Sequence, residues 1–360
     1  MKYIIDILIL LLLISCVFPP VQTPKQEDET VPIWVNDLER AFPSRDWVRV
    51  PGEAKTRAQA ENSVISALAQ TFRTDVESLT QASQRYSQFI REAGGIKDIN
   101  FEQSQNFEQM VTTGSRVRGL IGVQIDTYLA PNSTVYACAR MNRRECAARY
   151  SGMIRENTAN INRLLALAAS APEQGTFEVY SRLSFAHAIA QETDNFQNIL
   201  EVLDPSAINN RPSYGSANAI KIKMLECAAR ITIGITINTE KTEDRNSITR
   251  AASSFFTNLG FRINEQGSFG QSSAGNYVLR ANVRFEEQRF LRVIHCYYYL
   301  DAALENRNRT ALFAHSDSAS GTHVSITSEA RRNAVQAVEV SFKEGKFAQN
   351  FNTWLNSLLE

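Results

Sequence analysis

The sequence predicts an α+β protein in which two sheet-plus-helix domains are joined by a helical hairpin, after a leader and a flexible tether. The chain has 360 residues, and at about 150 residues per domain this length predicts about two domains. Hydrophobic residues make up 43% and charged residues 21% of the chain. These values are typical of a globular protein and exclude a disordered chain or a multi-span membrane protein. Segments with the two-residue period of strands alternate with segments of helical period, which indicates mixed secondary structure.

The charge balance argues against a nucleic acid as partner. The chain carries 38 Lys and Arg against 38 Asp and Glu, so its formal net charge is zero. Nucleic-acid-binding domains usually carry a basic excess. We therefore expect no nucleic-acid partner.

Residues 1–15 have the pattern of an export signal. Lys2 forms a short positive region, and residues 7–14 are an unbroken run of Ile and Leu. The run is shorter than the about 20 apolar residues that span a bilayer, and it fits the apolar core of a signal peptide. It ends in Leu-Ile-Ser-Cys at Cys16, which resembles a bacterial lipobox. That resemblance implies a lipoprotein signal peptide, cleaved before Cys16, and a lipid on the Cys16 thiol that palmitate would label. The alternative is an ordinary cleaved signal or a weak membrane anchor.

Residues 16–31 predict a lipidated tether. They contain three prolines and the charged run Lys-Gln-Glu-Asp-Glu, with few apolar side chains to bury. Such a segment stays extended and solvated. It would hold the body near a membrane, and we expect a location in the cell envelope, on the periplasmic side of the outer membrane.

The first domain is expected over residues 32–150, with the order β-α-β-β-α. Ala60, Val64 and Leu68 share one face of an amphipathic helix. A Pro-Asn-Ser turn separates two antiparallel strands. Residues 73–92 fit a helix or a strand. The expected elements, in order, cover residues 46–54, 56–72, 115–129, 134–141 and 143 onward.

Four short motifs of this domain resemble the LPP20-like lipoproteins. They are the Pro-x-Trp-Val opening, a Gly-Glu-Ala strand end, a Gly-Val-Gln-Ile-Asp strand and its partner Val-Tyr-Ala-Cys-Ala-Arg, at residues 32–35, 52–54, 122–126 and 135–140. The resemblance covers about a third of the chain. It implies an envelope lipoprotein with an α+β domain, and similar domains occur in surface lipoproteins and in a flagellar-base assembly protein. It supplies no catalytic residue.

The second half predicts a helical hairpin over residues 151–208 and a second α+β domain over residues 221–360. Two segments of helical period, 143–171 and 176–203, are joined by a Pro-Glu-Gln-Gly turn. In the second domain, Asp244 is expected to cap a helix and Gly260 to end it. The expected strands and helices of that domain cover residues 230–238, 245–259, 276–286, 293–304, 311–316 and 325–360.

The four cysteines of the body are candidates for disulfides. An exported protein can form them, and four cysteines allow three pairings. Pairing within each domain would join Cys138 to Cys146 and Cys227 to Cys296. The alternative is four buried free thiols.

No motif in the sequence indicates catalysis. The histidines and cysteines lack the spacing of a metal site, and the serine-enzyme and phosphate-loop signatures are absent. A metal between His315 and His323, across an expected Ser-rich loop at 316–322, is the weak exception. His187 is expected to be a core or interface residue of an apolar helix, and His295 to lie on the opposite strand face from Cys296. We expect no cofactor and no metal.

These observations predict a membrane-anchored lipoprotein that acts as a non-enzymatic binding or scaffold protein. The membrane would be one partner, through the lipid on Cys16, and other envelope proteins the second. The alternative is an envelope-polymer hydrolase with an unrecognised carboxylate site. Candidate binding surfaces are residues 73–95, residues 267–275 and the C-terminal helix around Trp354. The aromatic residues 297–299, Phe347 and Phe351 fit either a core or such a surface. The sequence leaves the oligomeric state open.

Overall fold

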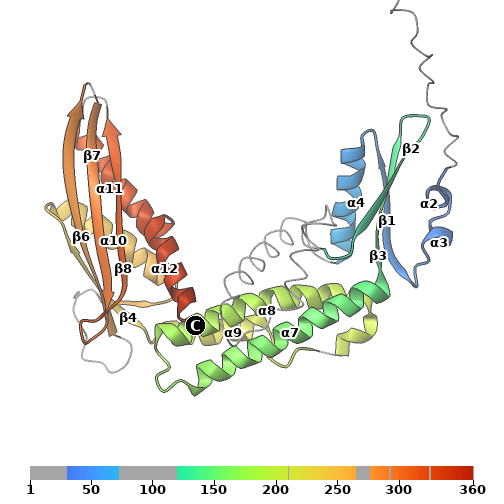
Figure 1. The fold of residues 1–360 in the computed structure, drawn as a ribbon, viewed down its shortest axis with the longest axis horizontal. Helices are drawn as coiled ribbons and strands as arrows, with labels where there is room; N and C mark the ends of the chain where they lie inside the picture. The colour runs from blue at the N-terminus through green and yellow to red at the C-terminus, as the bar shows by residue number, and fades with distance from the viewer. Residues whose placement is uncertain are drawn as a thin grey trace, which may run out of the picture.

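The structure, a computed structural model, describes residues 31–72, 120–209, 211–264, 276–291, 293–323 and 326–359. It has the expected mixed α+β fold, with a three-stranded sheet at one end of a pair of long helices and a five-stranded sheet at the other end (Figure 1). The expected signal peptide, Cys16, most of the tether and the candidate surfaces at 73–95 and 267–275 lie outside the described residues. None of the described helices is both long enough and apolar enough to cross a membrane.

The N-terminal domain follows the expected order. Two short helices, α2 (Ile33–Asn36) and α3 (Leu38–Ala41), precede β1 (Trp47–Ala54), α4 (Arg57–Thr71), β2 (Gln124–Leu129) and β3 (Val135–Asn142). The sheet order is β1-β3-β2, and both pairings are antiparallel. Alternate residues of β3 point to one face of the sheet, where they meet the apolar stripe of α4. This core contains Val135, Ala137, Ala139, Met141, Ala60, Val64 and Leu68.

The expected helical hairpin is confirmed as α7 (Arg143–Ser170) and α8 (Phe177–Leu203). The side chain of Asn142 caps α7 by accepting from Glu145 N, and that of Thr176 caps α8 by accepting from Val179 N. A buried hydrogen bond of 3.0 Å joins Asn157 to Thr193 across the pair. The first helix follows β3 without a break and runs past residue 150, so the hairpin grows directly out of the first sheet.

A helix between the hairpin and the second sheet was not predicted. After the 3-10 turn η1 (Pro205–Asn209), helix α9 (Ala217–Ala228) packs along α8, and Ser216 caps it. Its sequence Ala-Ile-Lys-Ile-Lys-Met alternates apolar and polar side chains, which hides the helical period. The Ser216 cap is the local signal that marks the helix start.

The C-terminal domain is a five-stranded sheet covered by helices on one face (Figure 1). The sheet order is β5-β4-β6-β7-β8; β4 is parallel to β5 and β6, and the other pairs are antiparallel. Ile231, Ile233, Ile235 and Ile237 are buried, as the alternation predicts. The elements are β4 (Thr232–Asn238), α10 (Thr242–Asn258), β5 (Arg262–Asn264), β6 (Asn276–Phe290), β7 (Val293–Glu305), β8 (Ala311–His323), α11 (Thr327–Lys343) and α12 (Lys346–Ser357).

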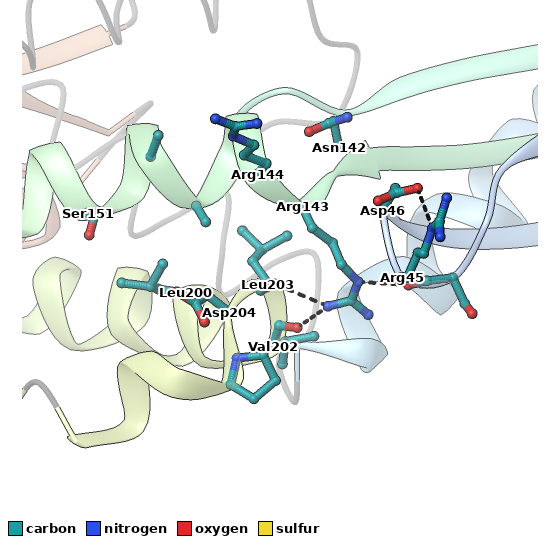
Figure 2. A pocket seen from close by; sticks show the side chains of 14 residues that line it. Arg45, Asp46, Asn142, Arg143, Arg144, Ser151, Leu200, Val202, Leu203 and Asp204 are labelled. Carbon is teal, nitrogen blue, oxygen red and sulfur yellow. Dashed lines mark hydrogen bonds and ion pairs between the residues drawn. The ribbon is translucent and has the colours of Figure 1, made fainter.

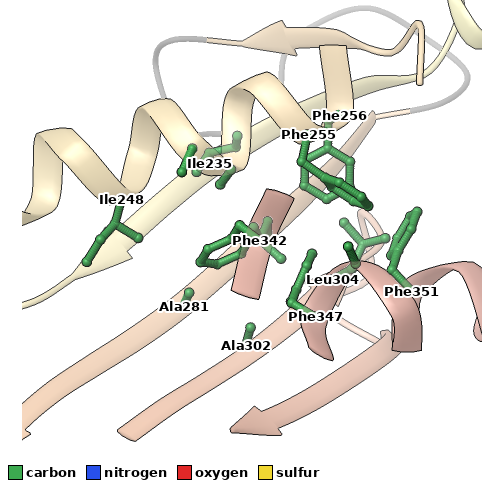
Figure 3. Close-up of a cluster of buried hydrophobic side chains, with 14 of the residues drawn as sticks. Ile235, Ile248, Phe255, Phe256, Ala281, Ala302, Leu304, Phe342, Phe347 and Phe351 are labelled. Atoms are coloured by element: carbon green, nitrogen blue, oxygen red, sulfur yellow. The ribbon is translucent and has the colours of Figure 1, made fainter. Parts of the chain in front are cut away.

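Phenylalanine rings from the helices fill the space above this sheet. Figure 3 shows Phe255 and Phe256 of α10 converging with Phe347 and Phe351 of α12. The rings of Phe256 and Phe351 are 5.4 Å apart and nearly perpendicular, an arrangement that aromatic pairs favour. This aromatic cluster is the centre of the second core.

Several expectations for this domain were wrong in detail. Asp244 does not cap α10, because the helix starts at Thr242 and the Asp244 carboxylate pairs with Arg331 at 2.9 Å. The expected Ser-rich loop at 316–322 is part of β8. The short strand β5 was not predicted. The C-terminal helix is two helices, which meet at Gly345. Gly260, in contrast, ends α10 with a φ of +90°, as expected.

Candidate functional site

An open groove of about 830 Å³ lies where the N-terminal sheet meets the helical hairpin (Figure 2). Its walls come from the segment before β1, the first three turns of α7 and the end of α8. It is lined by Ser44, Arg45, Asp46, Asn142, Arg143, Arg144, Ala147, Ala148, Ser151, Leu200, Val202, Leu203, Asp204 and Pro205.

Arg143 holds the three walls together. Its Nε donates to the carbonyl oxygen of Ser44 at 3.0 Å, and its Nη1 donates to the carbonyls of Val202 and Leu203 (Figure 2). The last carbonyls of a helix lack intrahelical partners, so the guanidinium also caps the C-terminus of α8. The groove is therefore a fixed feature of the fold.

The charges in the groove favour a polar or anionic occupant. Three arginines line it against two aspartates, and both carboxylates are engaged. Asp46 pairs with Arg45 at 3.1 Å, and Asp204 accepts from Ser206 N at 3.0 Å and Ser206 Oγ at 2.7 Å. Exposed Arg144 leaves a guanidinium for carboxylate or phosphate oxygens.

The groove contains no arrangement that is typical of catalysis. Neither His nor Cys is among its lining residues, and the only hydroxyl side chains are those of Ser44 and Ser151. Ser44 Oγ donates to Glu39, which already accepts from Ser44 N. A serine nucleophile is usually activated by a histidine or a lysine base, and the lining contains neither residue type. Across the described part of the chain, no group of three or more His, Cys, Asp or Glu could hold a metal ion.

The expected disulfide between Cys138 and Cys146 is not formed, since all four body cysteines are buried free thiols. The two sulfurs belong to opposite sides of the first sheet. Ala137 and Ala139 point into the core below α4, so Cys138 between them points to the other face. Cys146 is in the core, with its Sγ 4.0 Å from the carbonyl oxygen of Gly122.

The expected disulfide between Cys227 and Cys296 is also not formed, because they lie at opposite ends of the second sheet. Cys227 is near the end of α9, just before β4, and its Sγ is 3.8 Å from the carbonyl oxygen of Thr176. The first residue of β4, Thr232, pairs with Asn276, the first residue of β6. Cys296 pairs with Glu287, which is farther along β6 by about 36 Å at 3.3 Å per residue.

Burial also makes these thiols poor nucleophiles. It raises the pKa of Cys138, Cys146 and Cys227 to about 11, and it raises the pKa of Cys296 above its usual value. The thiolate is the reactive form of cysteine. The environments of the described cysteines are therefore those of structural residues.

The histidines are not brought together. His187 is half-buried on α8, and His295 lies on the opposite strand face from buried Cys296, as expected. His315 and His323 lie on the same strand, so about 26 Å of extended chain separates them. Buried His315 instead accepts a hydrogen bond at Nδ1 from Asn350 Nδ2, at 3.0 Å, and burial lowers the pKa of His315.

A charged cluster around Asp317 was missed by the sequence analysis. Its carboxylate accepts from Tyr298 Oη at 2.9 Å, Ser341 Oγ at 3.0 Å and Lys346 Nζ at 2.9 Å. Burial would raise the pKa of Asp317, but these hydrogen bonds and the Lys346 charge outweigh it and lower the pKa. The cluster ties β7, β8, α11 and α12 together, which is a structural role. It was missed because the strand was expected to end at residue 316.

The aromatic residues of the C-terminal helix follow the core alternative. Phe347 and Phe351 are fully buried, Tyr298 is buried, and Trp354 packs at 5.3 Å from Phe177. Tyr297 and Tyr299 are half-buried on the opposite face of β7 from Tyr298 and are not part of this core. The groove was not predicted, because its walls come from segments that are 99 and 59 residues apart in sequence.

Comparisons with known proteins place the chain in no family. No protein-family model and no curated protein matches it. Among solved structures, the secreted protein HP1454 from Helicobacter pylori is similar over 82% of this chain and 97% of its own, with 12% identity and a TM-score of 0.36. A candidate lipoprotein from Caulobacter crescentus CB15 is similar over 35% of this chain and 88% of its own, with 14% identity and a TM-score of 0.24. Similarities of this size establish neither a shared fold nor a shared function.

Proposed function

We propose that this chain is a lipid-anchored protein of the bacterial cell envelope that binds other envelope proteins and catalyses no reaction. The observation that carries the binding role is the open, arginine-lined groove in which both carboxylates are already engaged. Its occupant would be a polar or acidic segment of a partner protein. A groove of this kind recognises oxygen anions by charge and hydrogen bonding.

The anchor is the second part of the proposal. The Leu-Ile-Ser-Cys sequence at Cys16 and the polar, proline-containing segment after it support a lipid on Cys16. Multiple acyl chains give stable anchoring, since each buried CH₂ contributes about 0.8 kcal/mol. We also propose that the anchor lies on the periplasmic side of the outer membrane and that the chain is related to the LPP20-like lipoproteins.

The groove gives less support to a polymer hydrolase. Glycoside hydrolysis uses one carboxylic acid and one free carboxylate that flank the scissile bond. Asp46 is paired with Arg45, and Asp204 accepts two hydrogen bonds from Ser206. The two carboxylates would have to give up these partners to act on a substrate.

Replacing Cys16 with Ala tests the anchor. Lipidation requires the thiol, so we expect Cys16→Ala to remain an unprocessed precursor without palmitate label. Cys138→Ala is the matched control, because it also removes one thiol and should keep the label. Palmitate incorporation into the Cys16→Ala protein would show that the lipid is elsewhere.

A photo-crosslinking side chain in the groove tests the binding role. Ala148 is exposed and lines the groove, and Ala159 is exposed on the same face of α7, about 16 Å farther along the helix. In intact envelopes we expect a discrete adduct with another envelope protein from position 148 and not from position 159. Adding Arg144→Glu should abolish it. Equal adducts at both positions, or none at position 148, would contradict the groove as the binding site.

A further inference from the structure

The turn between β6 and β7 places two large apolar side chains in solvent. The ladder closes with Phe290 opposite Val293, so the turn has two residues. Phe290 is 70% exposed and Leu291 is 85% exposed, the two highest values for large apolar residues in the described part of the chain. Neither side chain can stabilise the fold by burial.

Leu291 is also unfavourable for the turn itself. Its φ is +56°, in the left-handed region where two-residue hairpin turns favour Asn, Asp or Gly. A bulky side chain there strains the backbone, and this one remains mostly in solvent. This leucine therefore contributes little to the stability of the fold.

The charges beside the turn are positive. In sequence the turn reads Arg-Phe-Leu-Arg over residues 289–292. Arg289 is exposed and makes no ion pair with the described residues. The nearest acidic residues in the strand, Glu286 and Glu287, are set back from the turn by about 10 Å of extended chain. Apolar tips with flanking arginines fit the interface of an anionic bilayer, where the rings and alkyl groups enter the acyl boundary and guanidinium groups bind phosphates.

The turn lies at the far end of its sheet from the helical hairpin (Figure 1). In the same view the β2–β3 turn of the other domain points to the same side of the hairpin. Leu129, the last residue of β2 before that turn, is 64% exposed. Two apolar tips on one side would let the body rest on a flat surface at both ends.

We propose that the β6–β7 turn is a membrane-contact loop, in which Phe290 and Leu291 insert into the interface of an anionic phospholipid bilayer and Arg289 binds headgroup phosphate. The contact is independent of a lipid on Cys16 and of an occupant in the groove. A loop of this size binds weakly alone and strengthens when a tether raises its effective concentration at the membrane.

Vesicle co-sedimentation of residues 17–360 tests this contact. This shortened protein keeps all residues that the structure describes and lacks both Cys16 and the apolar run before it. We expect binding to vesicles of phosphatidylethanolamine with phosphatidylglycerol, and little to phosphatidylcholine alone. Phe290→Ser with Leu291→Asn should lower the partition coefficient by about tenfold or more, since it removes the inserted apolar groups. Arg289→Gln should lower it less.

The matched control is Ile208→Ser with Ile222→Asn, which removes two exposed apolar side chains elsewhere, 53% and 52% exposed, and should bind as the parent does. Leu291→Asn suits the positive φ, so unchanged circular dichroism and Tm are expected for the loop variant. Absence of parent binding to anionic vesicles, or equal binding by the loop variant, would overturn the proposal. Loop-dependent self-association without vesicles would assign the turn to a second copy of the chain instead. The Cys16 and Ala148 experiments are unaffected by any of these results.

Discussion

Replacing Gly321 with Ala is expected to destabilise the C-terminal domain by about 3 kcal/mol or more, since it overpacks a contact between backbones. A Cβ at this position would lie 2.2 Å from the backbone nitrogen of Ala334 and 2.5 Å from the carbonyl oxygen of Ala330. Both atoms belong to α11, so no side-chain rotation can relieve the overlap. The helix would have to move away from β8, and Ala330 and Ala334, which are fully buried against the sheet, would lose their packing.

Urea unfolding at neutral pH measures this effect. The adjacent Ser320→Ala is the control, because Ser320 is exposed on the same strand, and its free energy of unfolding should change by less than about 0.5 kcal/mol. If Gly321→Ala were as stable as Ser320→Ala, the close crossing of β8 and α11 would be wrong.

Gly321 also explains why β8 was only half predicted. The sequence Ser-Asp-Ser-Ala-Ser-Gly-Thr after residue 315 has the composition of a loop, and propensity favours that interpretation. In the structure these residues form an edge strand that α11 covers closely. Small side chains are needed there for the close approach of a helix, and this requirement arises from tertiary packing. No local pattern in the sequence could reveal it.

The elements that were predicted well carry their signal locally. The two hairpin helices have long apolar stripes and side-chain caps at Asn142 and Thr176, and β4 alternates isoleucine with small or polar residues. The disulfide pairings failed because sequence proximity says nothing about strand faces or sheet ends. The groove was missed for a related reason, because Arg143 binds carbonyl groups of segments that are far away in the sequence. Local periodicity thus predicted the elements, and long-range contacts decided the site.

The helical hairpin is more than a connector, because each core includes part of it. Phe185 and Phe196 of α8 belong to the core of the first domain, whereas Phe177 and Leu183 belong to that of the second. Ser181 Oγ also donates to the carbonyl oxygen of Leu355 at 2.6 Å. The start of α8 is therefore fixed to α12, so a defect in the second core should reach the hairpin.

Replacing Phe351 with Ala is expected to produce such a defect, at a cost of about 3–5 kcal/mol in the free energy of unfolding. The ring is fully buried. It meets rings from three other elements: Phe177 of α8 at 6.0 Å, Phe256 of α10 at 5.4 Å and Phe313 of β8 at 5.4 Å. Truncation leaves a cavity among elements that separate contacts hold in place, so they cannot move together to fill it. The loss in the free energy of unfolding should therefore lie in the upper part of this range.

Phe290→Ala is the matched control, because it removes the same ring from a site that is 70% exposed. Its free energy of unfolding should change by less than about 0.5 kcal/mol. Hydrogen exchange then locates the damage. Since Phe177 loses a ring contact and Ser181 is bonded to α12, amides in the first turns of α8 should exchange faster in Phe351→Ala, while those of α4 in the other domain should keep their protection. Unchanged exchange at the start of α8 would mean that the hairpin and the second domain unfold independently, contrary to the shared core.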